Sequence, residues 1–196
     1  MTLLKKQFPN ILTILRLVLA FLCTYFAFQK DIKSLTFSLI LFCIASATDY
    51  FDGYLARKWK IVSSFGKLMD PIADKVLILG VFIAFAVQGI IPMILTILIF
   101  MREFLLTVIR LAISHKTVLA SRYSGKVKTF SQVIVLIAIY ILLIYKTTFL
   151  TFLTSDVISY LIIAMVVWVT IVSFYSAFDF LYHNRKVVKQ GLGIKT

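Results

Sequence analysis

The stretch TDYFDGYLARKWKIVSSFGKLMDPIADK, residues 48–75, carries four aspartates: Asp49, Asp52, Asp70 and Asp74. The whole chain of 196 residues has only eight acidic residues, so half of them lie in this one stretch. Long apolar segments run into the stretch from both sides, and its middle is basic. The pattern predicts two helices joined by a short loop, with the carboxylates near the loop.

Composition places these helices in a membrane. Hydrophobic residues make up 61% of the chain and the mean hydropathy is +1.00, whereas soluble domains are about half apolar. We therefore expect an all-α integral membrane protein with one domain covering residues 1–196. The net charge of +13 could indicate nucleic acid, but basic residues flanking membrane helices on the cytoplasmic side explain it better, so no nucleic-acid partner is expected.

Six apolar segments approach the length of about 20 residues that spans a bilayer. They cover residues 8–28, 35–55, 68–87, 91–113, 127–145 and 152–181. A short amphipathic stretch before Pro9 is expected at the membrane interface, and a basic tail follows the last segment. The aspartate stretch then joins the second and third helices.

The distribution of Lys and Arg predicts the orientation. Fifteen lie on the side of the termini: Lys5, Lys6, Arg57, Lys58, Lys60, Lys67, Arg110, Lys116, Arg122, Lys126, Lys128, Arg185, Lys186, Lys189 and Lys195. The opposite side has three, namely Lys30, Lys33 and Lys146, and the remaining three, Arg16, Lys75 and Arg102, fall inside segments. Because basic loops stay in the cytoplasm, we expect both termini and the aspartates to face the cytoplasm.

The spacing of the aspartates indicates a metal site. Asp49 and Asp52 are three residues apart and Asp70 and Asp74 are four apart, so each pair shares a helix face. Two facing pairs would repel one another, and burying them near lipid costs several kcal/mol more. Hard divalent cations with oxygen ligands, Mg²⁺ or Mn²⁺, would neutralise them. Two such ions form a clamp suited to phosphoryl transfer.

The residues between the two pairs fit a phosphorylated ligand. Gly53, Ala56 and Gly66 are small and leave space for it, and Arg57 can bind phosphate through two parallel hydrogen bonds. The acids could instead merely pair with bases in the bundle, or they could form the ion site of a cation transporter or channel. Neither alternative accounts for the glycines, the alanine and the arginine at these spacings.

The pattern D-x2-D-G-x2-A-R-x8-G-x3-D-x3-D in this stretch resembles the signature of the CDP-alcohol phosphotransferase family, and every fixed position matches. Members transfer a substituted phosphoryl group from a CDP-linked donor to an alcohol and release CMP. The resemblance covers nearly the whole chain. It implies a six-helix fold, two divalent cations held by Asp49, Asp52, Asp70 and Asp74, and a homodimer in a bacterial inner membrane.

The resemblance also implies roles for single residues. Asp74, together with Asp70, would be catalytic, with Asp74 as the general base. The CDP portion would contact Asp49, Asp52, Gly53, Ala56, Arg57 and Gly66. Asn10 and Thr13, at the entry of the first helix, either contact the nucleotide or cap the helix.

Three further stretches narrow the choice of acceptor substrate. FPNILTILR (residues 8–16), MREFLLTVIR (101–110) and SGKVKTFSQ (124–132) resemble members that join CDP-diacylglycerol to sn-glycerol 3-phosphate. Arg110, Lys126 and Lys128 would bind the acceptor phosphate, although the two lysines could instead belong to the ordinary cytoplasmic excess of basic residues. Arg102 and Glu103 could form an internal ion pair. Inositol, inositol phosphate, serine and phosphatidylglycerol are the alternative acceptors.

Overall fold

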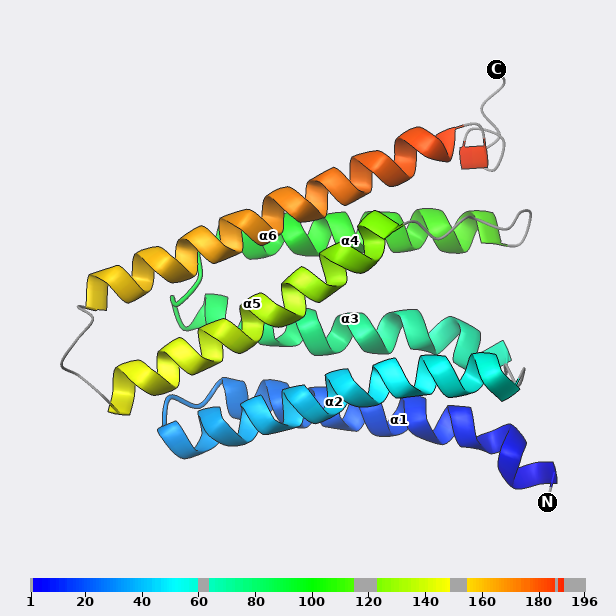
Figure 1. The fold of residues 1–196 in the computed structure, drawn as a ribbon, viewed down its shortest axis with the longest axis horizontal. Helices are drawn as coiled ribbons and strands as arrows, with labels where there is room; N and C mark the ends of the chain where they lie inside the picture. Colours follow the sequence, from blue (N-terminus) through cyan, green and yellow to red (C-terminus); the bar gives the residue numbers. More distant parts are fainter. Residues whose placement is uncertain (1, 60–63, 115–122, 149–154, 186, 189–196) are drawn as a thin grey trace.

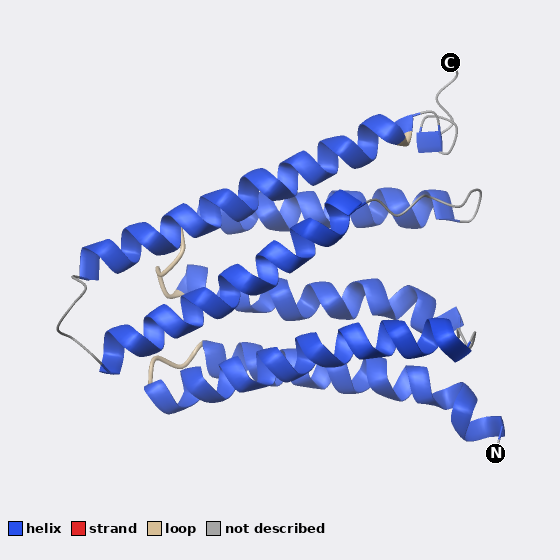
Figure 2. Ribbon diagram, in the orientation of Figure 1, coloured by secondary structure: helices blue, strands red, loops and turns tan. Residues whose placement is uncertain are grey.

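In the computed structural model of the protein, the described backbone covers residues 2–59, 64–114, 123–148, 155–185 and 187–188. Side chains are described for residues 14–48, 75–110, 123–146, 156–185 and 187–188. Within these ranges the regular structure is helical, as Figure 2 shows. The prediction of an all-α fold is confirmed for these residues.

The described residues form six long helices, which run back and forth along the molecule (Figure 1). Their bounds are α1 Thr2–Ala27, α2 Ile32–Trp59, α3 Ser64–Val87, α4 Met93–Ser114, α5 Tyr123–Thr148 and α6 Ser155–His183. Each corresponds to one predicted segment, with ends shifted by a few residues. The stretch before Pro9 belongs to α1, which bends near its N-terminal end (Figure 1).

Local sequence explains two of the helix ends. Asp31 caps α2, because its Oδ2 atom accepts a hydrogen bond from the Ser34 amide at 2.9 Å. That hydrogen bond holds the pKa of Asp31 below its usual range. Gly89 ends α3 with a φ of +75°, and the Ile90 amide reaches back to the Phe85 carbonyl at 2.9 Å. This left-handed turn is the one that glycine adopts without strain.

The helices pack around one cluster of buried apolar side chains. Helix α1 lies against α2 and α3, α5 lies against α2 and α6, and α4 contacts α3 and α6. Phe42, Phe82, Phe85 and Tyr140 are fully buried at the centre of the cluster. The hydroxyl of Tyr140 lies 2.6 Å from Ser38 Oγ, which donates in turn to the Cys23 carbonyl at 2.7 Å. This chain of hydrogen bonds ties α5, α2 and α1 together.

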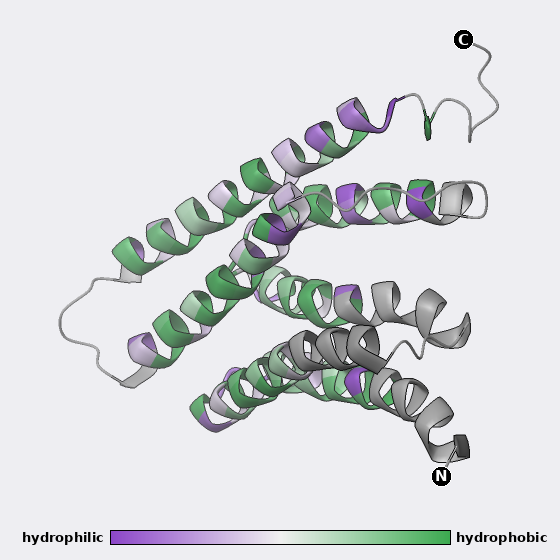
Figure 3. Cartoon of the chain, turned by 45° about the vertical axis from the view of Figure 1, so that its right-hand side comes forward, coloured by the Kyte–Doolittle hydropathy of each residue, from purple (hydrophilic) through white to green (hydrophobic). Residues whose placement is uncertain are grey.

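The outer surface is strongly apolar. Hydrophobic residues line the middle of α5 and α6, and hydrophilic ones gather toward the helix ends (Figure 3). Tyr160, Trp168 and Phe178 on α6 are all at least 60% exposed. Such a surface is a liability in water but is favourable in lipid.

Among the described residues, two helical stretches are long and apolar enough to cross a membrane, Tyr123–Lys146 and Asp156–His183. Shorter apolar stretches cover Ile14–Ala27, Ile32–Thr48 and Lys75–Val87. The fold is consistent with a membrane protein, and the count of six spans stays a prediction.

Candidate functional site

The predicted site residues of the aspartate stretch lie on two consecutive helices. The last turns of α2 carry Asp49, Asp52, Gly53, Ala56 and Arg57, and the first turns of α3 carry Gly66, Asp70 and Asp74. The backbone is helical at all these positions, so each aspartate pair shares a helix face. The C-terminal end of α2 and the N-terminal end of α3 lie at the same end of the molecule (Figure 1).

The residue types at these positions suit a divalent cation. Helices α2 and α3 contact one another, and carboxylate oxygens are the ligands that Mg²⁺ and Mn²⁺ take. The side chains at residues 49–74 lie outside those that the structure describes. Among the described side chains, no group of three or more His, Cys, Asp or Glu residues could hold a metal.

Asn10 and Thr13 lie on α1, which packs against both helices of the aspartate stretch. Their side chains also lie outside the described part. Their assignment to the nucleotide therefore stays a prediction.

The three predicted phosphate-binding cations come from two helices. Arg110 is exposed near the end of α4, with its guanidinium 4.6 Å from the centroid of the Phe180 ring on α6. Lys126 is exposed in the first turn of α5. Lys128 is only 8% exposed, and its Nζ lies 2.5 Å from Glu103 Oε1. Lys128 is therefore part of a buried ion cluster.

That cluster centres on the carboxylate of Glu103, which is 4% exposed. Its Oε1 atom also accepts a hydrogen bond from Arg102 Nη1 at 2.7 Å. Its Oε2 atom lies 3.4 Å from Nζ of Lys75 on α3. Cations from three helices thus contact one carboxylate. The Arg102–Glu103 ion pair, which the sequence offered as a possibility, is present.

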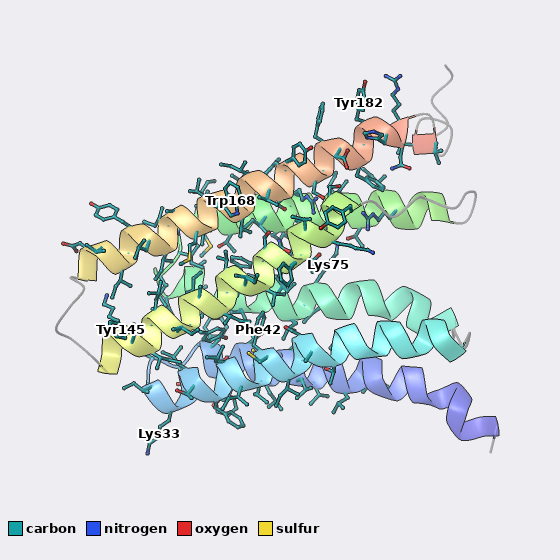
Figure 4. The ribbon with its side chains drawn as sticks, in the orientation of Figure 1. Lys33, Phe42, Lys75, Tyr145, Trp168 and Tyr182 are labelled. Atoms are coloured by element: carbon teal, nitrogen blue, oxygen red, sulfur yellow. The ribbon has the colours of Figure 1, made fainter. Side chains whose placement is uncertain are left out.

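Lys75 was missed as a site residue by sequence reasoning. Its side chain lies between α3 and its neighbours (Figure 4). The ammonium donates to the Glu103 carbonyl at 3.0 Å and to Thr107 Oγ1. The feature of the sequence that could have identified Lys75 is its position inside an apolar segment, directly after Asp74. An ionisable group at such a position needs a partner, and Glu103 is the acid of the neighbouring segment.

A second polar contact joins the start of α5 to α6. Ser124 Oγ donates to Asp179 Oδ2 at 2.6 Å, and Asp179 Oδ1 lies 3.1 Å from His183 Nδ1. This contact holds the first turn of α5, where Lys126 lies, against the end of α6.

Comparison with known proteins decides the family. The sequence model of the protein family described as CDP-alcohol phosphatidyltransferase matches residues 6–178 of this chain. The chain belongs to the CDP-alcohol phosphatidyltransferase family. The matched region contains the whole aspartate stretch, the Glu103 cluster and Arg110. The family and the two long apolar helices indicate a membrane protein.

Several curated relatives in this family cover most of the chain. A CDP-diacylglycerol–glycerol-3-phosphate 3-phosphatidyltransferase of Mycoplasma genitalium is 34% identical over 204 aligned residues, which cover 95% of this chain and 86% of the relative. A protein of the same name from Rickettsia felis is 37% identical over 175 residues, covering 88% of this chain and 94% of the relative. One from Bacillus subtilis is 43% identical over 101 residues, about half of each chain.

Proposed function

We propose that this protein transfers the phosphatidyl group of CDP-diacylglycerol to sn-glycerol 3-phosphate, giving phosphatidylglycerophosphate and CMP. The observation that carries the proposal is the likeness, over most of both chains, to relatives named for this reaction. The complete aspartate signature, on the end of α2 and the start of α3, supports it.

The proposed donor site is built on α1, α2 and α3. Gly53, Ala56 and Gly66 leave room for the cytidine diphosphate portion, Arg57 binds its phosphates, and Asn10 and Thr13 approach from α1. Asp49, Asp52, Asp70 and Asp74 would hold two divalent cations, Mg²⁺ or Mn²⁺. When bound, these cations balance the charge of the diphosphate.

The proposed reaction is one displacement at phosphorus. The C1 hydroxyl oxygen of glycerol 3-phosphate attacks the phosphorus that carries the diacylglycerol. The bond from that phosphorus to the CMP oxygen breaks, and CMP leaves with the bonding electron pair. Asp74 accepts the hydroxyl proton as general base, and Arg57 stabilises the negative charge that develops on the leaving phosphate.

The proposed acceptor site lies where α4 ends and α5 begins. Arg110, Lys126 and Lys128 carry the positive charge that a phosphorylated acceptor needs. An acceptor without an anionic group, such as inositol, would leave this positive charge unused.

We further propose a single domain of six membrane spans in the bacterial inner membrane. Both termini and the active site face the cytoplasm, where glycerol 3-phosphate is found, and CDP-diacylglycerol enters laterally from the lipid. The excess of basic residues on one side and the bacterial relatives support this placement. The homodimer that the family resemblance implies stays a prediction.

Replacing Asp70 or Asp74 with asparagine tests the reaction. Each change removes a charged ligand, and Asp74→Asn also removes the proposed base, so CMP release should fall to background with CDP-diacylglycerol and glycerol 3-phosphate. Asp31→Asn is the control, because Asp31 is an exposed helix cap and asparagine caps equally well. Full turnover by either variant would contradict the mechanism. If the wild-type enzyme released CMP faster with another acceptor, that acceptor and not glycerol 3-phosphate would be the substrate.

A further inference from the structure

The buried cluster around Glu103 connects to the aspartate stretch through Lys75. Lys75 follows Asp74 directly in α3, and it is the described residue through which α3 reaches the cluster. Its ammonium contacts the Glu103 carboxylate at 3.4 Å, the Glu103 carbonyl at 3.0 Å and the Thr107 hydroxyl. All three partners are on α4, so Lys75 fastens α3 to two successive turns of that helix.

The partners on α4 are themselves held in place. Thr107 Oγ1 donates to the Glu103 carbonyl at 2.7 Å. The Glu103 carboxylate is fixed from its other side by Arg102 at 2.7 Å and by Lys128 at 2.5 Å. The acceptor of the Lys75 ammonium is therefore a rigid group buried between α3, α4 and α5.

This contact contributes to how α3 is rotated about its own axis. Successive residues of a helix are about 100° apart around the axis, so the direction of residue 75 defines the directions of residues 70 and 74. Turning α3 far in either sense would carry the Lys75 ammonium away from these acceptors. A half-buried ammonium without partners is strongly unfavourable, so the contact resists rotation.

We propose that Glu103 is a positioning residue, which acts through Lys75 to set the rotation of α3 and hence the direction in which the Asp70–Asp74 face is presented. The proposal deepens the proposed function and rests on its divalent-cation site. Glu103 itself touches neither substrate nor cation in this scheme.

The test is Mn²⁺ binding to the purified full-length protein in detergent without substrates, measured from the electron paramagnetic resonance signal of free Mn²⁺. In Lys75→Met the positive charge beside the aspartates is lost. Electrostatics alone then predicts tighter Mn²⁺ binding. Loss of positioning predicts the opposite, a dissociation constant about tenfold or more above wild type, as for other residues that orient metal ligands. Unchanged or tighter binding would overturn the proposal.

Lys33→Met is the control. Lys33 is an exposed lysine in the first turn of α2, so the change removes one positive charge and leaves the Glu103 cluster and the anchor of α3 intact. We expect Mn²⁺ affinity equal to wild type. A loss as large as that of Lys75→Met would show that the effect is not specific to α3 and would count against the proposal.

Thr107→Val gives a second, uncharged test in case Lys75→Met is not recovered as a monodisperse protein. It removes one acceptor of Lys75 without altering charge or shape, so positioning predicts weaker Mn²⁺ binding, by a smaller factor. Affinity identical to wild type would contradict it. CMP release by the wild-type protein distinguishes failure of this proposal from failure of the proposed function. If the protein bound Mn²⁺ but did not turn over glycerol 3-phosphate, the proposed function would be overturned. The comparison of Mn²⁺ affinity between the variants would still test the positioning role.

Discussion

Arg110 is the predicted phosphate-binding residue whose described surroundings suit that role best. Its guanidinium lies 4.6 Å from the centroid of the Phe180 ring, and aromatic stacking of this kind orients a guanidinium while leaving its hydrogen-bond donors available. The side chain is exposed, so it can reach a ligand that arrives from the aqueous side.

Replacing Arg110 with glutamine should therefore weaken acceptor binding selectively. A hydrogen bond to a charged group contributes about 1.5–3 kcal/mol, so the KM for glycerol 3-phosphate should rise about tenfold or more. The KM for CDP-diacylglycerol should stay unchanged. Arg185→Gln is the matched control, because Arg185 also lies over a ring, that of Tyr182 at 5.3 Å, and is assigned no ligand. An equal rise in both KM values would refute the assignment.

Two lysines show how much the spacing along a helix matters. Lys126 and Lys128 are two positions apart on α5, which places them about 200° apart around the helix. Lys126 is exposed, whereas Lys128 is buried against Glu103. The two lysines that are assigned to the acceptor phosphate therefore lie in different environments, one exposed and one buried.

At the scale of the elements, close packing of α1 on α3 depends on Gly80. A Cβ atom added there would clash with Thr24 Oγ1 on α1. The Thr24 hydroxyl already donates to the Ala20 carbonyl at 2.8 Å, so it cannot move without losing that hydrogen bond. Small residues at such crossings let helix backbones approach one another in membranes.

Gly80→Ala should destabilise the protein, although alanine favours a helix. Overpacking costs about 1–3 kcal/mol, more than the roughly 1 kcal/mol gained from helix propensity. Gly125→Ala is the same change on α5, where an added Cβ meets nothing within 4 Å, so it should be neutral or stabilising. Thermal unfolding of both variants in detergent measures the difference. A higher midpoint for Gly80→Ala than for wild type would show that the crossing has room to spare.

The whole molecule has a proposed orientation that labelling can test. Lys33 is exposed in the first turn of α2, and Tyr123 is 80% exposed at the start of α5. Because α2 and α5 begin on opposite sides in the proposed topology, Lys33→Cys should react with a membrane-impermeant thiol reagent in intact spheroplasts. Tyr123→Cys should react only after the membrane is permeabilised.

Both variants are made with Cys43 replaced by alanine, since Cys43 is exposed, and the buried Cys23 is left in place. Labelling of Tyr123→Cys from the outside would invert the proposed orientation. Equal labelling of both positions from one side would contradict the six-span count.

The sequence by itself determined the helices and the positions of the aspartate stretch. A chain in lipid must satisfy its backbone hydrogen bonds within each segment, so apolar length and loop charge locate helices without knowledge of their neighbours. The spacing of Asp49 with Asp52 and of Asp70 with Asp74 is equally local, because a helix fixes which positions share a face.

Only the tertiary structure decided which helix faces meet. Lys75 contacts Glu103, which is 28 residues away in the sequence, and Tyr140 contacts Ser38, which is 102 residues away. No local pattern encodes such contacts, because the rotation and tilt of each helix are set by packing on all its sides at once. That is why the sequence revealed Glu103 as one half of a possible ion pair with Arg102, whereas the fold made it the meeting point of three helices.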